Sequence, residues 1–272
     1  MRILFLGTAA AEGIPGMFCQ CDLCMKAKKL GGHNIRTRSS ILIDYTLKID
    51  LPPDNYLHLT KYNLDFSRIS HIFITHSHQD HFYPEDLRLR YKPFAHMRDA
   101  NPLYVYGNER VISSVKEVIK GKEDKVIIPV QLEPFKEVRV SEDCIVIPLL
   151  ADHDINETCF IYLIKINGFN ILHGYDSGWF PDKTWDFLKK YRLDVVILDC
   201  TCAAKDCSKY HMGINCLLKV KEKMINEGMA NGKTIFVATH FSHNGGLLHE
   251  ELERILEPKG VIPAYDGLML KL

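Results

Sequence analysis

Short apolar runs separated by polar loops dominate the chain, and a few longer stretches carry apolar residues three or four positions apart. The first pattern is typical of buried strands and the second of amphipathic helices. It predicts strands over residues 2–7, 39–45, 47–51, 69–75, 103–106, 126–132, 144–150, 158–166, 194–199, 233–239 and 261–265, and a return strand from residue 169. It predicts helices over residues 109–120, 181–191, 214–226 and 247–256, and partly helical stretches over 25–29 and 84–98. A strand-rich first half followed by alternating strands and helices indicates an α/β protein.

The chain is expected to form one domain over residues 1–272. Its 272 residues, 46% of them hydrophobic, are enough to bury a large core. No repeat, low-complexity run or Pro/Gly/Ser-rich linker interrupts the predicted elements.

Charge and cysteine content narrow the function classes. Lys and Arg total 34, as do Asp and Glu, so the formal net charge is zero. This balance counts against nucleic acid and against an anionic membrane surface as partners. The sequence shows neither a signal peptide nor an apolar run of about 18 residues, so we expect a cytoplasmic protein. Nine cysteines, an odd number, then favour thiolate metal ligands and buried thiols over disulfides.

A group of metal-ligand side chains follows the predicted strand 69–75. The segment reads His76-Ser77-His78-Gln79-Asp80-His81, an HxHxDH pattern. Imidazole and carboxylate are the usual ligands of Zn, Mn or Fe, and a strand that ends in several of them is what a two-metal site needs. A solvated polar turn is the alternative, which would be favoured if only one or two histidines were present.

Other predicted strands end in the same kind of residue. His153 follows strand 144–150, Asp176 follows the return strand, and His240 follows strand 233–239. Together with the HxHxDH segment they supply two metals with three ligands each and a bridging carboxylate. Asp50 is expected either to support this site from behind or to lie at the surface, and His173 is expected in the core or behind the ligands.

Two cysteine groups and a basic cluster leave alternatives open. Cys19, Cys21 and Cys24 form CxCxxC, which offers three corners of a zinc site or else loop thiols or a redox pair. The unusual CxCx4C spacing of Cys200, Cys202 and Cys207 predicts free thiols. Basic residues in 84–98 form either a phosphate-binding cluster or a solvated face. These residues are Arg88, Arg90, Lys92, His96 and Arg98.

The ligand set resembles that of the metallo-β-lactamase superfamily over nearly the whole chain. The resemblance implies an αββα sandwich with a dinuclear site at one edge. It assigns His76, His78 and His153 to one divalent metal, Asp80, His81 and His240 to the other, and Asp176 to the bridge. The metals implied are Zn, Mn, Fe or Ni.

Within that superfamily, the CxCxxC segment and His243 resemble the PhnP-type phosphodiesterase family of phosphonate degradation. A protein of pyrroloquinoline-quinone synthesis also carries a CxCxxC insertion. The resemblance implies a structural zinc in an insertion at about residues 17–30, held by Cys19, Cys21, Cys24 and His243.

The resemblance also suggests the chemistry. Asp80 and His211 are the expected catalytic residues, with His211 as general acid for the leaving group; the alternative for His211 is a helix-capping or surface histidine. The leading hypothesis is a phosphodiesterase that hydrolyses a small cyclic or nucleotide-like phosphodiester, such as a phosphoribosyl cyclic phosphate, by attack of a metal-bridging hydroxide. Alternatives are a thioester or lactam hydrolase and a non-hydrolytic accessory protein, whereas zero net charge disfavours a nuclease. A homodimer is a further expectation.

Overall fold

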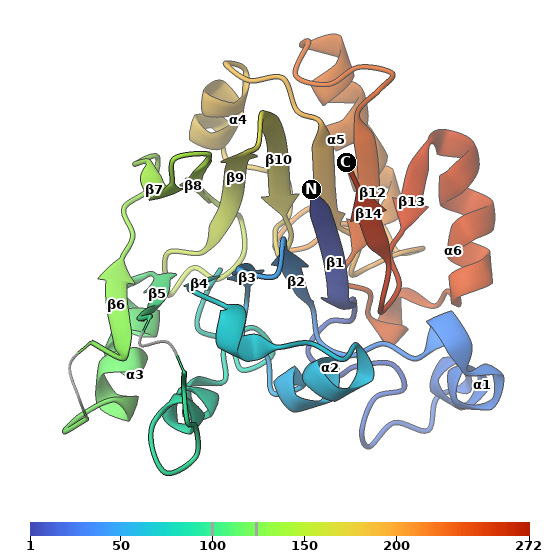
Figure 1. Ribbon diagram of the computed structural model, residues 1–272. Helices are drawn as coiled ribbons and strands as arrows, with labels where there is room; N and C mark the ends of the chain where they lie inside the picture. The colour runs from blue at the N-terminus through green and yellow to red at the C-terminus, as the bar shows by residue number, and fades with distance from the viewer. Residues whose placement is uncertain (99–100, 123–124) are drawn as a thin grey trace.

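The computed structural model describes residues 1–98, 101–122 and 125–272, which form two seven-stranded sheets (Figure 1). In order of pairing, the strands of the first sheet are β14 (Met269–Lys271), β1 (Arg2–Gly7), β2 (Ser40–Ile43), β3 (Leu47–Ile49), β4 (His71–Phe73), β5 (Leu103–Gly107) and β6 (Ile127–Gln131). Those of the second sheet are β13 (Val261–Pro263), β12 (Ile235–Thr239), β11 (Val195–Asp199), β10 (Phe169–Gly174), β9 (Phe160–Ile166), β8 (Cys144–Leu150) and β7 (Val138–Ser141).

Helices connect and cover the strands. The α-helices are α1 (Asp22–Leu30), α2 (Asn55–Lys61), α3 (Glu109–Val118), α4 (Asp182–Leu188), α5 (Ile214–Asn226) and α6 (His249–Leu256). The short 3-10 helices are η1 (Gly32–Asn34), η2 (Phe66–Arg68), η3 (Pro84–Arg90), η4 (His243–Gly245) and η5 (Glu257–Lys259). In Figure 1, α4 and α5 lie at the top of the view and α2 and α3 at the bottom. None of the helices in the described parts of the chain is long and apolar enough to cross a membrane.

Alternating side chains of the strands build three apolar layers. In β1, Ile3 and Phe5 pack between the two sheets, whereas Leu4 and Leu6 face the outer side of the first sheet. This alternation follows from the two-residue period of a strand. The outer layer of the first sheet includes residues of α3 and η3, and that of the second includes residues of α4, α5 and α6. The predicted αββα sandwich is therefore confirmed.

Strand direction brings the loops of the second sheet to one edge. β10, β11, β12 and β13 run parallel, and β8 points the same way because β9 is antiparallel to both β8 and β10. The carboxyl ends of β8, β10, β11 and β12 thus meet at one edge. The end of β4 is fastened to the second sheet, because Phe160 N donates to Thr75 O at 2.9 Å and Tyr162 Oη to Ile74 O at 2.6 Å. Both sheets therefore deliver residues to one place.

Candidate functional site

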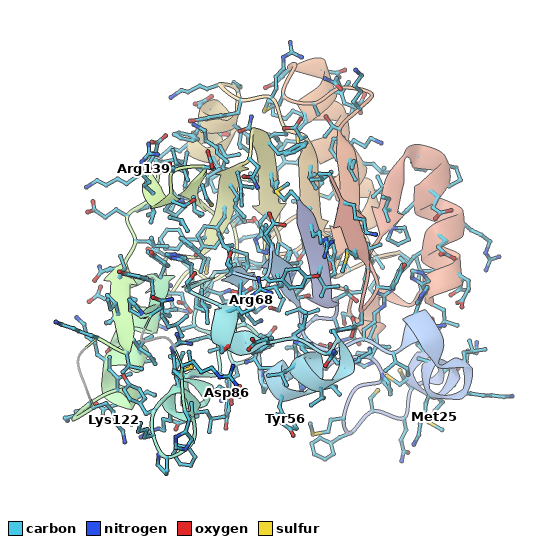
Figure 2. All side chains as sticks on the ribbon, in the orientation of Figure 1. Met25, Tyr56, Arg68, Asp86, Lys122 and Arg139 are labelled. Carbon is cyan, nitrogen blue, oxygen red and sulfur yellow. A yellow bond between two sulfur atoms is a disulfide. The ribbon has the colours of Figure 1, made fainter. Side chains whose placement is uncertain are left out.

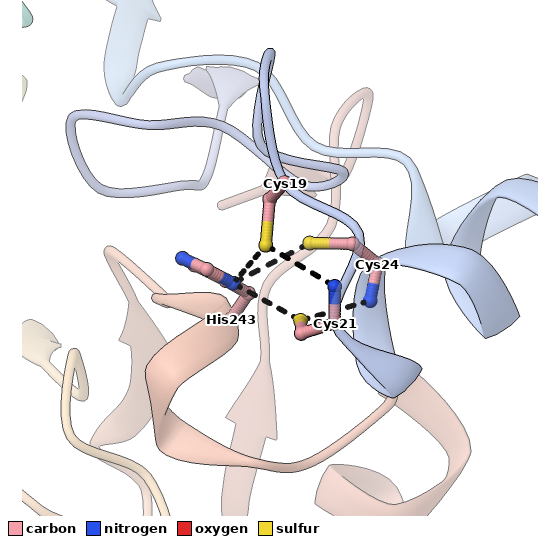
Figure 3. Close-up of side chains that lie close together, drawn as sticks. All are labelled: Cys19, Cys21, Cys24 and His243. Carbon is pink, nitrogen blue, oxygen red and sulfur yellow. Dashed lines mark hydrogen bonds between the residues drawn. The ribbon is translucent and has the colours of Figure 1, made fainter.

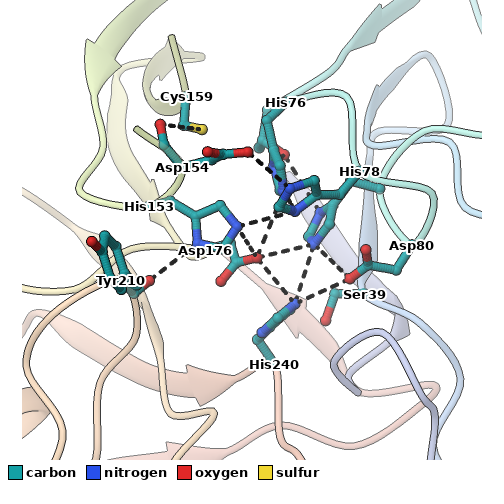
Figure 4. Close-up of polar contacts among 12 residues, drawn as sticks. Ser39, His76, His78, Asp80, His153, Asp154, Cys159, Asp176, Tyr210 and His240 are labelled. Atoms are coloured by element: carbon teal, nitrogen blue, oxygen red, sulfur yellow. Dashed lines mark hydrogen bonds and ion pairs between the residues drawn. The ribbon is translucent and has the colours of Figure 1, made fainter. Parts of the chain in front are cut away.

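The structure gathers the predicted ligands into two adjoining groups (Figure 4). In the first, His78 Nδ1 lies 2.9 Å from His76 Nε2 and 3.2 Å from His153 Nε2. These three residues come from the loops after β4 and β8. The first group therefore depends on both sheets being packed together.

The second group contains Asp80, His81, Asp176 and His240. His81 Nε2 lies 3.1 Å from Asp80 Oδ2 and 3.2 Å from His240 Nε2. Asp176 lies between the two groups, with Oδ2 at 3.3 Å from His153 Nε2 and 3.4 Å from His81 Nε2. Its carboxylate is thus within reach of a cation in either group.

The hydrogen-bond partners behind the three rings of the first group assign the ring proton to the outer nitrogen of each, which would leave the inward nitrogen free to bind a cation. Thr75 Oγ1 donates to Asp50 Oδ1, so it accepts from His76 Nδ1 at 3.0 Å, and His153 Nδ1 donates to Tyr210 O at 3.2 Å. His78 instead contacts Asp154 through Nε2 at 3.3 Å, which leaves its Nδ1 bare. Three lone pairs of electrons consequently face one another.

In His81 and His240, too, the hydrogen-bond partner lies behind the ring, at Nδ1. His81 Nδ1 donates to Asp50 Oδ2 at 2.7 Å, and His240 Nδ1 donates to Thr201 Oγ1 at 2.8 Å. With these protons on Nδ1, the Nε2 atoms of both rings would be available to a cation, and a cation there would take the place of the second proton that the surrounding carboxylates otherwise favour on His81 by raising its pKa. Ligand atoms about 2.0–2.1 Å from a tetrahedral zinc lie roughly 3.3 Å apart, close to the separations seen here. The residues therefore fit a pair of divalent cations.

Asp50 and Asp199 hold the rings from behind. Both Asp50 oxygens are used, because Oδ1 also accepts from Thr75 N at 2.8 Å. Asp199 accepts from Thr201 Oγ1 at 2.8 Å and from Met212 N at 2.8 Å. Of the two positions predicted for Asp50, the one behind the site is thus observed, and the one at the surface is not. Asp199 was not predicted, although it ends strand β11 as Asp176 follows β10, and that position was the available signal.

Glu157 is a second residue that sequence reasoning missed. Its carboxylate accepts from Ser77 N at 3.0 Å, from Ser77 Oγ at 2.7 Å and from Asn108 Nδ2 at 2.6 Å. It thereby fixes the peptide between His76 and His78. Glu157 lies in the loop between β8 and β9, outside any motif, so no sequence signal identified it.

His211 lies beside Asp176, the carboxylate that is predicted to bridge the two cations. Its Nδ1 is 2.6 Å from Asp176 Oδ1 and 3.3 Å from Asp199 Oδ2. Burial by itself lowers the pKa of His211, but hydrogen bonds to Asp176 and Asp199 outweigh it and raise that pKa to about 11. Burial likewise disfavours ionised Asp176, yet His240 and His211 keep the pKa of its carboxyl well below the usual range. His211 is therefore part of the site and not a helix cap.

His173 and the basic cluster lie elsewhere. His173 is fully buried next to Tyr175, with ring centroids 4.0 Å apart, as the core alternative predicted, and burial lowers its pKa to about 4. Arg90, His96 and Arg98 line a polar pocket with Arg68 beside η2. None of these basic residues belongs to the two groups of predicted metal ligands.

The predicted structural-zinc residues converge in a separate cluster (Figure 3). His243 Nδ1 lies 3.4, 3.3 and 3.4 Å from the Sγ atoms of Cys19, Cys21 and Cys24. Contact with His243 lowers the pKa of Cys21 to about 6, whereas burial raises that of Cys24 to about 12. A cation among the four atoms would hold all three thiols as thiolates, so the donor set fits tetrahedral zinc.

The prediction of free thiols after β11 is wrong for two residues. Cys202 and Cys207 form a disulfide, whereas Cys200 is free and buried. The loop folds back so that Cys202 N donates to Met212 O at 3.0 Å, and the two Cα atoms lie 6.2 Å apart, within disulfide range. Spacing along the chain does not reveal such a reversal.

Comparison with known proteins identifies the family. The model of the beta-lactamase superfamily domain matches residues 41–241. A search of curated protein sequences found no match. Among solved structures, a diphosphatase from the PhnP family is 24% identical with a TM-score of 0.76, covering 100% of this chain and 97% of its own.

Two further structures share the fold. Zn2+-bound PqqB from Methylobacterium extorquens is 19% identical with a TM-score of 0.74 and full coverage of both chains. Human tRNase Z, short form, is 18% identical with a TM-score of 0.68, covering 100% of this chain and 99% of its own. With a family model matching most of its length, two packed sheets and inward-facing histidines at their joint edge, the chain belongs to the beta-lactamase superfamily and is a hydrolase of the metallo-β-lactamase fold.

Proposed function

We propose that this protein is a metal-dependent phosphodiesterase that hydrolyses a small cyclic or nucleotide-like phosphodiester, such as a phosphoribosyl cyclic phosphate. The observation that carries the proposal is the position of His211 next to Asp176, where the two ligand groups meet. Phosphodiester hydrolysis needs a proton for the departing alkoxide, and His211 offers one at the site.

The residues divide the work between holding cations and moving a proton. His76, His78 and His153 would hold one divalent ion, Asp80, His81 and His240 the other, and Asp176 would contact both. Such ions supply positive charge for phosphoryl oxygens and lower the pKa of water enough for attack at neutral pH. Asp176 and Asp199 orient His211 through Nδ1, which leaves Nε2 to face the leaving group.

The PhnP-family diphosphatase supports phosphorus chemistry, because 97% of its chain aligns with the whole of this one. Zn2+-bound PqqB aligns over its whole chain as well, so the shared fold alone does not distinguish the phosphodiesterase from the alternative of a non-hydrolytic accessory protein. The cluster of Cys19, Cys21, Cys24 and His243, called the Cys3His cluster below, does not distinguish the phosphodiesterase from the accessory protein. An assay of substrate turnover does.

A substrate panel tests the proposed activity. The metal-loaded protein should hydrolyse bis(4-nitrophenyl) phosphate or 2′,3′-cyclic nucleotides with a higher kcat/KM than a lactam or a thioester. Metal content measured on the same sample makes a negative result interpretable. Full metal occupancy without phosphodiester turnover would overturn the proposal in favour of an accessory role, and a preference for the thioester or lactam would move it to carbon-centred hydrolysis.

The role of His211 is tested with substrates that differ in their leaving group. In His211→Ala, hydrolysis of a diester with an alkyl leaving group should fall about 100-fold or more, whereas the nitrophenyl diester should lose less than about tenfold, because nitrophenolate leaves without a proton. His33→Ala, which removes an exposed histidine outside the two ligand groups and the basic cluster, is the matched control. Equal losses on both substrates would exclude the acid role.

A further inference from the structure

The backbone on both sides of His211 is bound by a carboxylate. Met212 N donates to Asp199 Oδ1 at 2.8 Å, and Tyr210 N donates to Asp152 Oδ2 at 3.1 Å. Asp199 also lies close to the ring of His211, whereas Asp152 holds His211 through the backbone of Tyr210. The two carboxylates together determine where the loop after β11 presents this ring.

Tyr210 adopts a backbone conformation that needs support from its neighbours. Its φ is 66°, in the left-handed region, which is unusual for a residue with a bulky side chain. Such a conformation costs free energy and persists where surrounding groups hold it in place. Here Asp152 accepts from Tyr210 N, and His153 Nδ1 donates to Tyr210 O at 3.2 Å (Figure 4). The residue before His211 is therefore held between a carboxylate and a predicted metal ligand.

Asp152 joins the three loops that meet at this place. It lies in the loop after β8, and its side chain binds Tyr210 in the loop after β11. Its backbone binds the loop after β10, because Asp152 N donates to Ser177 Oγ at 3.0 Å and Asp152 O accepts from Gly178 N at 2.9 Å. One residue thus connects the loops that follow three neighbouring parts of the second sheet.

The environment of Asp152 differs from that of charged residues on the surface. Lys122 and Arg139, for example, are exposed and lie at the outer edge of the molecule in Figure 2. Asp152 is half-buried, and one of its carboxylate oxygens is used by a backbone amide. A hydrogen bond to an ionised acceptor is roughly twice as strong as one between neutral groups. The bond from Asp152 is therefore suited to holding a strained turn.

The loops are packed so closely that position 178 leaves no room for a side chain. A Cβ on Gly178 would lie 2.6 Å from Ser208 O, 2.6 Å from Tyr210 N and 2.7 Å from Asp152 Oδ2. These distances are well below van der Waals contact. A change at this junction would therefore displace Tyr210, and His211 with it.

We propose that Asp152 is a positioning residue for proton transfer, which holds Tyr210 N and thereby keeps His211 directed at the leaving group. In the held position, His211 Nδ1 lies 2.6 Å from Asp176 Oδ1. A misplacement of about 1 Å can slow a reaction about 100-fold, so a small loosening of the loop is enough to impair the acid. The proposal rests on the proposed phosphodiesterase function. It adds that substrates with a poor leaving group depend on Asp152.

Substrates with different leaving groups separate this role from a general loss of structure. In metal-loaded Asp152→Ala, kcat for a 2′,3′-cyclic nucleotide, which has an alkoxide leaving group, should fall about 10- to 100-fold, and that for bis(4-nitrophenyl) phosphate less than about threefold. Asp152→Asn should restore most of the lost rate, because an amide oxygen can still accept from Tyr210 N. Asp206→Ala, which removes an exposed aspartate of the same loop, should behave as the native protein does.

A double variant tests whether Asp152 acts through His211. Once His211→Ala is present, Asp152→Ala should cause no further loss on the cyclic nucleotide, so the two effects should not add. If Asp152→Ala does not fold, as judged by circular dichroism, Gly178→Ala replaces it, because its methyl group crowds Tyr210 N from the other side. Additive losses, or equal losses on both substrates, would overturn the proposal.

Hydrogen exchange tests the contact itself without a substrate. Mass spectrometry of a peptide that covers residues 205–213 should show lost protection in Asp152→Ala and native protection in Asp152→Asn. Phosphodiester turnover by the native protein with unchanged exchange in Asp152→Ala would overturn this proposal alone. Absence of turnover by the metal-loaded native protein would overturn the proposed function and this proposal with it.

Discussion

Asp50 orients His81 and the backbone before His76 by accepting hydrogen bonds from His81 and Thr75. It leaves β3 with a left-handed φ of 61°, a conformation that costs free energy for a residue with a side chain, and His240 leaves β12 with a φ of 62°. The strained turn aims both Asp50 oxygens at the HxHxDH loop, where they meet His81 and Thr75. The strained backbone at the ends of β3 and β12 therefore orients the side chains of the site.

Replacing Asp50 by Asn should impair metal binding without removing any ligand. An amide can turn its NH2 toward His81 Nδ1, which then becomes an acceptor and shifts the ring proton to Nε2. We expect roughly 10- to 100-fold weaker metal binding, measured by competition with a chelator. Asp186→Asn on the surface of α4 is the control. Unchanged affinity in Asp50→Asn would show that the carboxylate does not set the ring proton.

Lys48 predicts how stability depends on pH. It is fully buried, its amine donates to Asp50 O at 2.7 Å, and burial lowers its pKa from 10.5 to about 7. Between those values the unfolded chain binds more protons, so the free energy of unfolding should rise with pH, by up to about 1.4 kcal/mol per pH unit. In Lys48→Met that contribution should be absent.

Urea denaturation at pH 7, 8.5 and 10 measures the effect as a difference between variants. The advantage of Lys48→Met over the native protein should be greatest at pH 7 and shrink as the pH rises. Lys61→Met, at an exposed position of α2, should show no such trend. If the free energy of unfolding changed equally with pH in the native protein and in Lys48→Met, the lowered pKa of Lys48 would be contradicted.

The convergence of the predicted ligands could be anticipated from sequence because each follows an apolar strand, whereas the residues that support them could be anticipated only in part. His76, His153, Asp176 and His240 stand next to runs whose burial can be read from composition. Glu157 supports Ser77 from a loop 80 positions away, and only folding brings them together. Long-range polar pairing of this kind carries no periodic signal.

At the scale of elements, most strands and helices with an apolar face were predicted, whereas α2 and β14 were not. α5 matches its predicted bounds, Ile214–Asn226, and β8 matches Cys144–Leu150. α2 was missed because its buried residues are Asn55 and His58, which are polar. β14 was missed because only Leu270 of its three residues is buried. Packing against the rest of the molecule, not local pattern, selects these two elements.

The loop between β8 and β9 should control metal affinity through Glu157. In Glu157→Gln one side-chain oxygen becomes an NH2 group, which cannot accept from Ser77 N or Asn108 Nδ2. We expect about tenfold weaker metal binding at the group of three histidines, with a parallel loss of kcat. Glu133→Gln, which alters an exposed pair with Lys136, is the control. Normal metal affinity in Glu157→Gln would mean that the loop is held by other contacts.

At the scale of the whole molecule, the Cys3His cluster joins α1 and the segment before it to η4, which lies far away in sequence. Cys21→Ser should lower the metal content by about one ion per chain and reduce the melting temperature, since structural zinc contributes directly to folding. Met25→Ser, which changes an exposed residue of α1, should do neither. A full metal complement in Cys21→Ser would argue against zinc at this cluster.

His240 and His243 stand three positions apart, yet the first lies with Asp80, His81 and Asp176 and the second in the Cys3His cluster. A ribosome delivers both of them after every other ligand of either centre. A nascent chain that does not yet include residues 240–243 therefore lacks one predicted ligand of each centre, even when its earlier strands have folded. If both groups bind the metals that we propose, neither centre can be completed until the segment that carries His240 and His243 has been synthesised.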